Sequence, residues 1–146
     1  MIHLVALLLM WQGLGPGGAG SAKGVMGEWR GPTSAVLRVY ACGNDVCVKL
    51  IKPSGDATRK DVHNPETGLR GRPFCGLELG SGFKRTDANH AGDGKLYDPD
   101  SGHTYKGTMT AEGDLLKLRG YMGIPLFGRT ETWQRVPVGS VAECGK

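Results

Sequence analysis

The residues from Asp98 to His103 bring two aspartates, a serine and a histidine within six positions of one another. Carboxylates two residues apart followed by a glycine are typical of calcium loops, and serine, histidine and aspartate are the groups of a hydrolytic triad. A calcium loop needs further acidic ligands and a closing glutamate, which this segment lacks. Side chains adjacent in sequence also point to different sides of a strand or turn. We therefore predict a hairpin turn here, and a hydrolase that uses Asp98, Asp100 and His103 is the third of three hypotheses.

Three histidines, His63, His90 and His103, are the other candidates for metal ligands, and they fall in predicted loops. Nothing in their spacing fixes their mutual distances, as the spacing of a zinc motif does. The chain also has no Gly-x-Ser-x-Gly stretch for a nucleophile elbow. We therefore expect no metal, no cofactor and no catalytic residue, and we favour a protein that is not an enzyme.

The first 22 residues have the pattern of a secretory signal peptide. An apolar run from Leu4 to Trp11 is followed by glycines and a proline, and then by small residues through Ala22. The run is too short for a membrane span, which takes about 20 apolar residues in a helix. We expect cleavage near Ala22 and a mature domain over 23–146, with a short tail at 137–146, in the periplasm or outside the cell.

Export would bring the chain into an oxidising compartment, where its even set of four cysteines can form disulfides. Cys42 and Cys47 bracket a turn-forming stretch between two apolar strands, which predicts a disulfide across a hairpin. Cys75 falls on the apolar face of a predicted strand, which is typical of a buried thiol. A bond between Cys75 and Cys144, or a free Cys144 that links two chains, are the alternatives.

Short alternating segments indicate that the mature chain is almost entirely β-strand. Glycine accounts for 25 of the 146 residues, and the longest mature stretch without glycine or proline, Thr33 to Cys42, is shorter than an average helix. Apolar and polar residues alternate in it as in a strand with one buried face. The predicted strands lie near 27–30, 34–42, 47–52, 74–84, 92–98, 103–111, 114–121 and 128–136.

The connections between these strands indicate how they are arranged. The segments 98–102 and 112–114 are tight turns of the kind that joins antiparallel neighbours. Eight such strands close most economically into an up-and-down barrel, whose lumen is filled by side chains or holds one small ligand. The net charge of +4 is not clustered as in nucleic-acid-binding proteins, so we expect no nucleic-acid partner.

Several motifs resemble those of the bacterial family called domain of unknown function 2147. They are CGNDVC at 42–47, LRGRP at 69–73, LYDPDSGHTY at 96–105 and RGYMGIPLFGRTETW at 119–133. The resemblance covers about Val25 to Val136 and implies an exported envelope protein with a calycin-like, that is lipocalin-like, barrel. The family has no established catalytic residues, so the resemblance implies no activity. Separately, Trp29 on the first strand, with Trp133 and Arg135 on the last, is similar to the lipocalin pattern of a tryptophan that closes the barrel base under an arginine.

Two segments are the candidates for binding. The connection from Pro53 to Arg72 is long for a compact domain and basic, so Arg70 and Arg72 are expected at the barrel mouth, where they would receive a carboxylate or phosphate. The alternative is that these arginines pair with carboxylates of their own loop. The apolar segment from Tyr121 to Phe127 is expected to cap one end of the lumen, and an exposed binding tip is its alternative.

The sequence therefore predicts an all-β, eight-stranded, calycin-like barrel that binds a small, partly apolar or anionic ligand. The candidate ligand-binding residues are Arg70, Arg72, Tyr121, Ile124 and Phe127, while Trp29, Trp133 and Arg135 are expected to be structural. The second hypothesis is a module with a filled barrel that contacts other envelope proteins through its apolar tip. In either case we expect a monomer without a membrane span.

Overall fold

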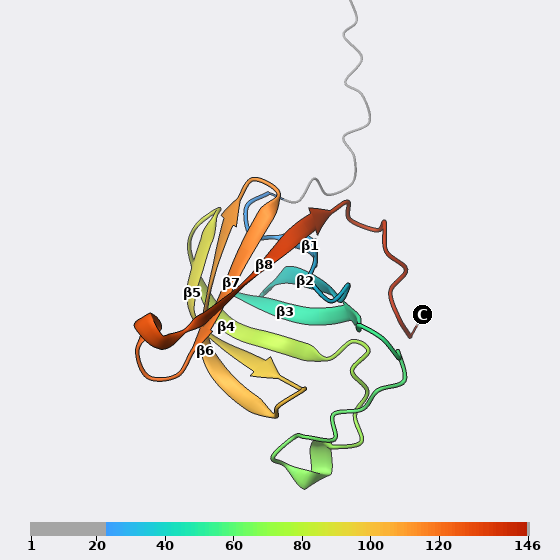
Figure 1. Cartoon of the computed structure of the whole chain (residues 1–146). Helices are drawn as coiled ribbons and strands as arrows, with labels where there is room; N and C mark the ends of the chain where they lie inside the picture. Colours follow the sequence, from blue (N-terminus) through green and yellow to red (C-terminus); the bar gives the residue numbers. More distant parts are fainter. Residues whose placement is uncertain (1–22, 146) are drawn as a thin grey trace, which may run out of the picture.

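The computed structural model describes residues 23–145, which form one closed antiparallel barrel (Figure 1). The expected signal peptide lies outside the described residues. The strands are β1 (Gly27–Arg30), β2 (Val36–Cys42), β3 (Asp45–Lys52), β4 (Glu78–Asp87), β5 (His90–Asp98), β6 (His103–Glu112), β7 (Leu115–Tyr121) and β8 (Arg129–Val136). Each strand pairs with the next along the chain, and β1 pairs with β8 to close the ring. The predicted up-and-down barrel is confirmed.

Helical structure in the described residues is limited to two 3-10 turns, η1 (Thr67–Leu69) and η2 (Pro125–Phe127). Neither belongs to a helix long and apolar enough to cross a membrane. The strands follow from the alternation seen in the sequence: on β7, Leu116 and Leu118 are buried while Leu115 and Lys117 are exposed. Apolar side chains on alternate positions therefore line the inside of the barrel.

Glycines on β4, β5 and β6 make room for Phe83, the largest buried side chain of β4. Phe83 is completely buried, and a Cβ built on Gly94 of β5 would lie 2.4 Å from its ring. A Cβ on Gly80 or Gly107 would also meet that ring, at 3.1 and 2.9 Å. Because real Cβ atoms do not approach other carbon atoms so closely, these positions accept only glycine while Phe83 keeps its place.

One end of the barrel is closed by the residues that precede β1. Val25 is completely buried, and its carbonyl accepts a hydrogen bond from the indole N–H of the buried Trp29 at 3.0 Å. The Arg135 guanidinium lies 4.1 Å from the centre of the Trp29 ring and donates to the carbonyls of Gly24 and Met26. Cation–π contact and hydrogen bonds thus fasten the chain entry across this end.

Strands β3 and β4 begin at other residues than the sequence predicts. The turn between β2 and β3 is only Gly43–Asn44, so β3 begins at Asp45 and Cys47 pairs with Tyr40. Cys47 then lies diagonally from Cys42, and the structure forms the predicted bond between them, with the two Cα atoms 5.9 Å apart. Strand β4 begins at Glu78 rather than near 74, because residues 74–77 form a turn hydrogen-bonded to β3.

The chain after β8 crosses the outside of β1–β3 as a strap (residues 137–145), seen at the right of Figure 1. Cys144 forms a disulfide with Cys75, so the expected buried thiol at Cys75 is wrong and the alternative bond is the one present. Cys75 lies in the turn before β4, outside the predicted strand face. The Cys144 N–H also donates to the Ile51 carbonyl at 2.9 Å.

Ion pairs hold the same strap against the sheet. Glu143 binds Arg38 at 3.0 Å and Lys49 at 3.6 Å. Burial acts to lower the pKa of Arg38, but hydrogen bonds and charge from Glu143 and then Glu28 outweigh it and raise that pKa. Glu28 is itself buried under the strap, where one of its oxygens also accepts the Gly139 N–H.

Candidate functional site

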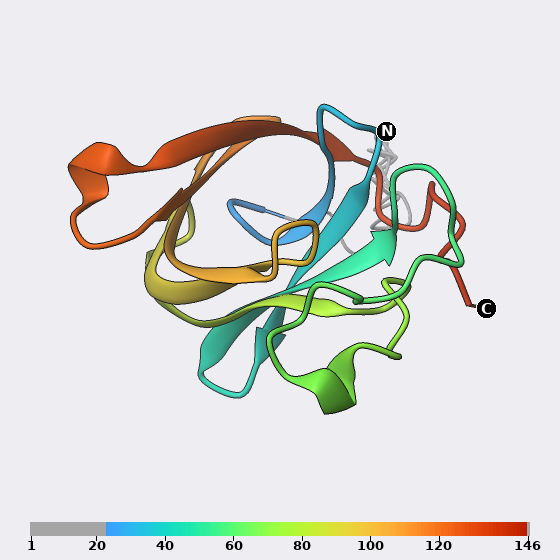
Figure 2. The same ribbon diagram turned by 60° about the horizontal axis from the view of Figure 1, so that its bottom comes forward.

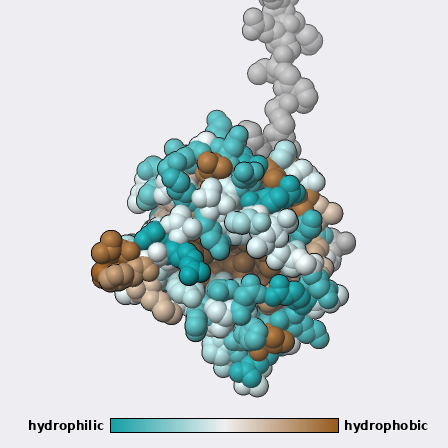
Figure 3. Space-filling model, viewed as in Figure 1, coloured by the Kyte–Doolittle hydropathy of each residue, from teal (hydrophilic) through white to brown (hydrophobic). Residues whose placement is uncertain are grey.

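The end of the barrel opposite Trp29 opens into a cavity of about 690 Å³. Figure 2 looks toward the ring of strands, and Figure 3 shows a hollow with an apolar floor beside the strands. Its lining comes from seven of the eight strands, all but β1, and from the β1–β2, β3–β4, β5–β6 and β7–β8 connections, and it is more apolar than polar. Its apolar residues include Ala35, Leu37, Val48, Leu50, Phe74, Leu79, Leu96, Leu118 and Trp133. Such a lining favours apolar groups that leave water.

Gly120 of β7 is an inward position without a side chain, and it borders this space. It pairs with Arg129 of β8 and with Gly107 of β6, whose own vacant position is already filled by Leu96 and Phe83. A Cβ on Gly120 would lie at ordinary contact distance from Tyr105, 3.4 Å from its Cβ. The lumen is therefore wide at this level, and the structure leaves room there for one more side chain.

Charged groups ring the cavity mouth. Arg59, from the long β3–β4 loop, pairs with Asp100 of the β5–β6 turn, and its guanidinium lies 4.6 Å from the centre of the Phe74 ring. Arg129 and Glu131 reach the same lining from β8. The mouth thus presents both charges around an apolar interior, which suits a ligand with an apolar body and a polar end.

Trp133 lines this cavity from β8 and is 7% exposed. Its indole N–H has no hydrogen-bond partner among the described residues. The six-membered part of its ring packs on Gly31, where an added Cβ would come within 2.5 Å. A buried donor without an acceptor costs about 1–3 kcal/mol, so this N–H lowers local stability.

The structure places Arg72 in a network that fastens the long loop to the barrel wall. The completely buried Asp61 accepts hydrogen bonds from Arg72 at 2.8 Å, from Asn64 at 2.9 Å and from the Tyr97 hydroxyl at 2.5 Å. Burial acts to raise the pKa of Asp61, but these three hydrogen bonds outweigh it and lower that pKa. Burial and then the bond to Asp61 raise the pKa of Tyr97 to about 12.

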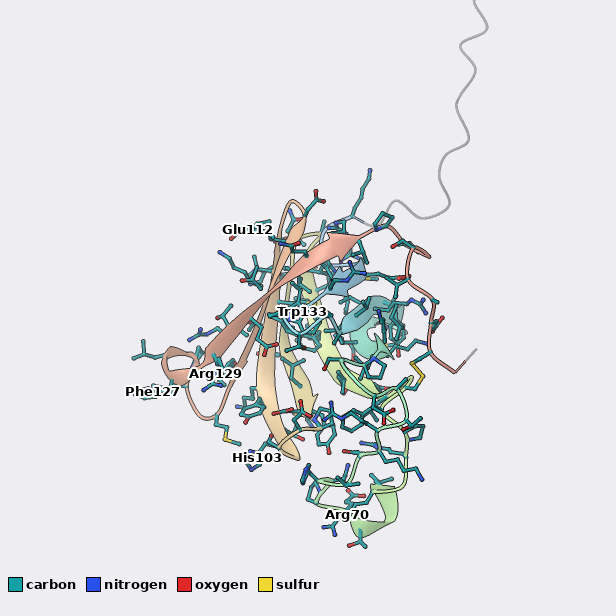
Figure 4. The ribbon with its side chains drawn as sticks, turned by 45° about the vertical axis from the view of Figure 1, so that its right-hand side comes forward. Arg70, His103, Glu112, Phe127, Arg129 and Trp133 are labelled. Carbon is teal, nitrogen blue, oxygen red and sulfur yellow. A yellow bond between two sulfur atoms is a disulfide. The ribbon has the colours of Figure 1, made fainter. Side chains whose placement is uncertain are left out.

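Arg70 and Arg72 therefore do not line the cavity, and the expectation that they form its mouth is corrected. Arg70 donates to the Asn64 carbonyl inside its own loop at 2.8 Å. Figure 4 shows Arg70 on the loop, far from Arg129 and Trp133. Both arginines donate hydrogen bonds within their own loop. For Arg72 the partner is a carboxylate, as the alternative interpretation held, whereas for Arg70 it is a carbonyl.

The apolar segment 121–127 does not cap the barrel, so that expectation is wrong. Ile124, Leu126 and Phe127 are 52%, 77% and 78% exposed, and Figures 3 and 4 show the segment projecting from the barrel. Tyr121 and Phe127 lie in the cavity lining, whereas Ile124 does not. The segment is therefore an exposed tip, which was the alternative interpretation.

The residues of the hydrolase hypothesis do not act together. The Asp98 carboxylate accepts hydrogen bonds from the Asp100 N–H and from Ser101, which is the geometry of the predicted turn. Asp100 pairs with Arg59, and His103 lies against Tyr105. With its three groups held by different partners, this hypothesis has no geometry to support it.

His90 and His103 are apart, while the backbone of His63 packs on Gly102, next to His103. His90 contacts Thr110, whereas His103 lies at the opposite end of β6. Among the described residues no group of three or more histidine, cysteine or acidic side chains has the geometry of a metal site.

Arg129 and Glu131 are the mouth residues that the sequence interpretation missed. For them the signal was present, because alternation from the buried Trp133 puts residues 131 and 129 on the same inner face. Arg59 belongs to the basic connection that was expected at the mouth, but Arg70 and Arg72 were selected from it, because which arginine faces the cavity depends on how the long loop folds back over the barrel.

Comparison with solved structures finds a similar fold in a protein of Helicobacter pylori, HP1028, which is described as belonging to the lipocalin family. The TM-score is 0.71 at 22% identity, over 77% of this chain and 82% of that chain. The chain has no match among the curated proteins compared. The family model described as an uncharacterized protein conserved in bacteria, DUF2147, matches residues 27–135. The chain, whose motifs already resembled that family, therefore belongs to the DUF2147 family and folds as a lipocalin-like barrel.

Proposed function

We propose that this protein is an exported carrier that binds one small ligand, with an apolar body and a polar end, in the lumen of its barrel. The observation that carries the proposal is the open cavity of about 690 Å³ with apolar walls and a charged mouth. This volume lies within the roughly 300–1,000 Å³ range of small-molecule sites. A cavity of this size supports the ligand-binding hypothesis over the second hypothesis, which requires a filled barrel.

The two disulfides support export. Such bonds persist in the periplasm and outside the cell and are rare in a reducing cytosol. The signal peptide expected before Lys23 would deliver the chain to such a compartment. We further propose that it acts there as a monomer, because a single barrel encloses the whole cavity.

Native mass spectrometry of the mature chain from Lys23, with its disulfides oxidised, tests for a bound ligand. A non-covalent adduct of defined mass is expected. In parallel, titration with 8-anilinonaphthalene-1-sulfonate, an apolar fluorophore with one anionic group, is expected to saturate at one site per chain. Gly120→Leu places a side chain in the lumen where the backbone tolerates it, and it is expected to weaken that binding about tenfold or more.

The matched control is Thr132→Leu, which adds the same side chain to the exposed, outward face of β8. It is expected to leave fluorophore affinity unchanged. Equal affinities for wild type, Gly120→Leu and Thr132→Leu would show that the fluorophore binds elsewhere, and together with an adduct-free mass would count against a carrier.

A further inference from the structure

The tip formed by residues 122–128 exposes more apolar surface than any other segment of the described barrel. Its large apolar side chains, Met122, Ile124, Leu126 and Phe127, are between 52% and 78% exposed. Met122 and Phe127 also belong to the cavity lining, so the tip stands directly beside the mouth. Clustered side chains of this kind usually mark a contact with a partner or a membrane.

The tip is held in this projecting shape by polar contacts. Arg119 of β7 donates two hydrogen bonds to the Pro125 carbonyl and a third to the Thr130 hydroxyl, at 2.8 Å. A Cβ on Gly128 would lie 2.9 Å from the Arg119 side chain, so the return of the chain passes close over the guanidinium. The guanidinium therefore fixes the η2 turn while the apolar side chains face solvent.

Cations lie on one side of the base of the tip. Lys95 and Lys106 are cross-strand neighbours on the outer face of β5 and β6, and Lys106 is in register with Tyr121, the residue of β7 that precedes the tip. Two lysines directly opposite each other repel, and the described residues show neither of them in an ion pair. Between Lys117 and Glu131 the chain has no carboxylate, and Glu131 itself lines the cavity.

We infer that this tip docks the barrel on an anionic lipid surface, with the apolar side chains in the interface and the cations against the headgroups. Apolar side chains that enter the interface and cations that meet anionic headgroups are the two contributions that drive interfacial binding. A protein partner of standard size would instead require about 20–30 residues on each side. The mouth beside the tip then faces the membrane, from which an amphiphilic ligand can enter; only this last step rests on the proposed function.

Vesicle flotation of the mature, oxidised chain tests the docking. Binding is expected to vesicles of phosphatidylglycerol mixed with phosphatidylcholine, and to weaken as salt is added, but not to phosphatidylcholine alone. Ile124→Ser with Leu126→Ser is expected to lower the partition coefficient about tenfold or more. Lys95→Gln with Lys106→Gln is expected to lower it roughly tenfold. Neither pair lies in the cavity lining, so fluorophore binding in the lumen reports independently on the carrier.

Val62→Ser with Val138→Ser is the control, because these valines are 57% and 48% exposed on other segments. Leu126→Trp adds a direct readout, since bromine-labelled lipid should quench the added fluorescence. Absence of vesicle binding by the wild type, or tip and control variants that bind equally, would overturn the docking. A wild-type dimer that Ile124→Ser with Leu126→Ser makes monomeric, without vesicle binding, would assign the tip to contact between proteins instead.

Discussion

At the scale of single residues, Asp61 is the buried charge on which the long β3–β4 loop depends. Three donors satisfy its carboxylate, and Arg72 also lies 5.6 Å from the centre of the Tyr97 ring. A buried carboxylate is tolerated only when hydrogen bonds and a counter-charge replace its water. This network fastens the loop to β5, and the Arg59–Asp100 ion pair holds the loop at the cavity mouth.

Asp61→Asn is expected to lower the free energy of unfolding by about 3 kcal/mol at neutral pH, because Arg72 and Tyr97 lose their anionic partner. The folded pKa of Asp61 lies below its ordinary value of 3.8, so the unfolded chain binds the proton first as pH falls. The contribution is complete above about pH 4–5 and is lost on acidification through the folded pKa. Urea unfolding from pH 7 to pH 3 should therefore show the difference between variant and wild type shrinking.

Glu66→Gln is the control for this prediction, because Glu66 is exposed in the same loop and takes part in its hydrogen bonds through its backbone N–H. It is expected to unfold like the wild type across the range. A gap between Asp61→Asn and wild type that stays constant down to pH 3 would mean that the carboxylate charge does not stabilise the loop.

The same network explains why the candidate site was only half predictable from sequence. A basic loop is visible in composition, but whether an arginine faces a cavity or a carboxylate of its own loop depends on backbone turns around residues 60–73 that no periodicity describes. Residues on strands are different, since alternation from Trp133 leads directly to Glu131 and Arg129.

At the scale of elements, β5 combines an inner glycine that is required with an outer one that is not. Gly94→Ala would put its Cβ 2.4 Å from the ring of Phe83, which must then move in a filled core. The expected loss in the free energy of unfolding is about 1–3 kcal/mol or more. Gly92→Ala on the same strand would meet only a Thr108 methyl, at 3.9 Å.

Chemical denaturation of both variants measures this, and Gly92→Ala is expected to unfold near the wild type. Combining Gly94→Ala with Phe83→Leu should cost less than the sum of the two single changes, because the smaller side chain relieves the contact. Equal unfolding of Gly94→Ala and Gly92→Ala would show that Phe83 has room that the structure does not indicate.

Most strands were predictable because alternation, glycine and short turns act locally. The exceptions have tertiary causes. Residues 74–77 alternate like a strand, but the turn there bonds to β3 and to Cys144 through Cys75. The segment 121–127 was expected to cover the lumen on the rule that apolar side chains are buried, but Arg119 holds the tip outside instead.

At the scale of the whole molecule, the two disulfides are expected to contribute unequally. Cys75–Cys144 joins residues 69 apart and Cys42–Cys47 residues 5 apart. By restricting the unfolded chain, the bond that closes the long loop is expected to add about 4 kcal/mol to the free energy of unfolding, and the bond that closes the short loop about 2 kcal/mol. Only the long bond also ties the strap over the buried Glu28 and its partner Arg38.

Cys75→Ala with Cys144→Ala should therefore destabilise the barrel by more than Cys42→Ala with Cys47→Ala, in thermal unfolding of the mature chain without reductant. Equal losses would mean that the strap adds nothing to the closed barrel and that the entropy of the longer loop is offset elsewhere.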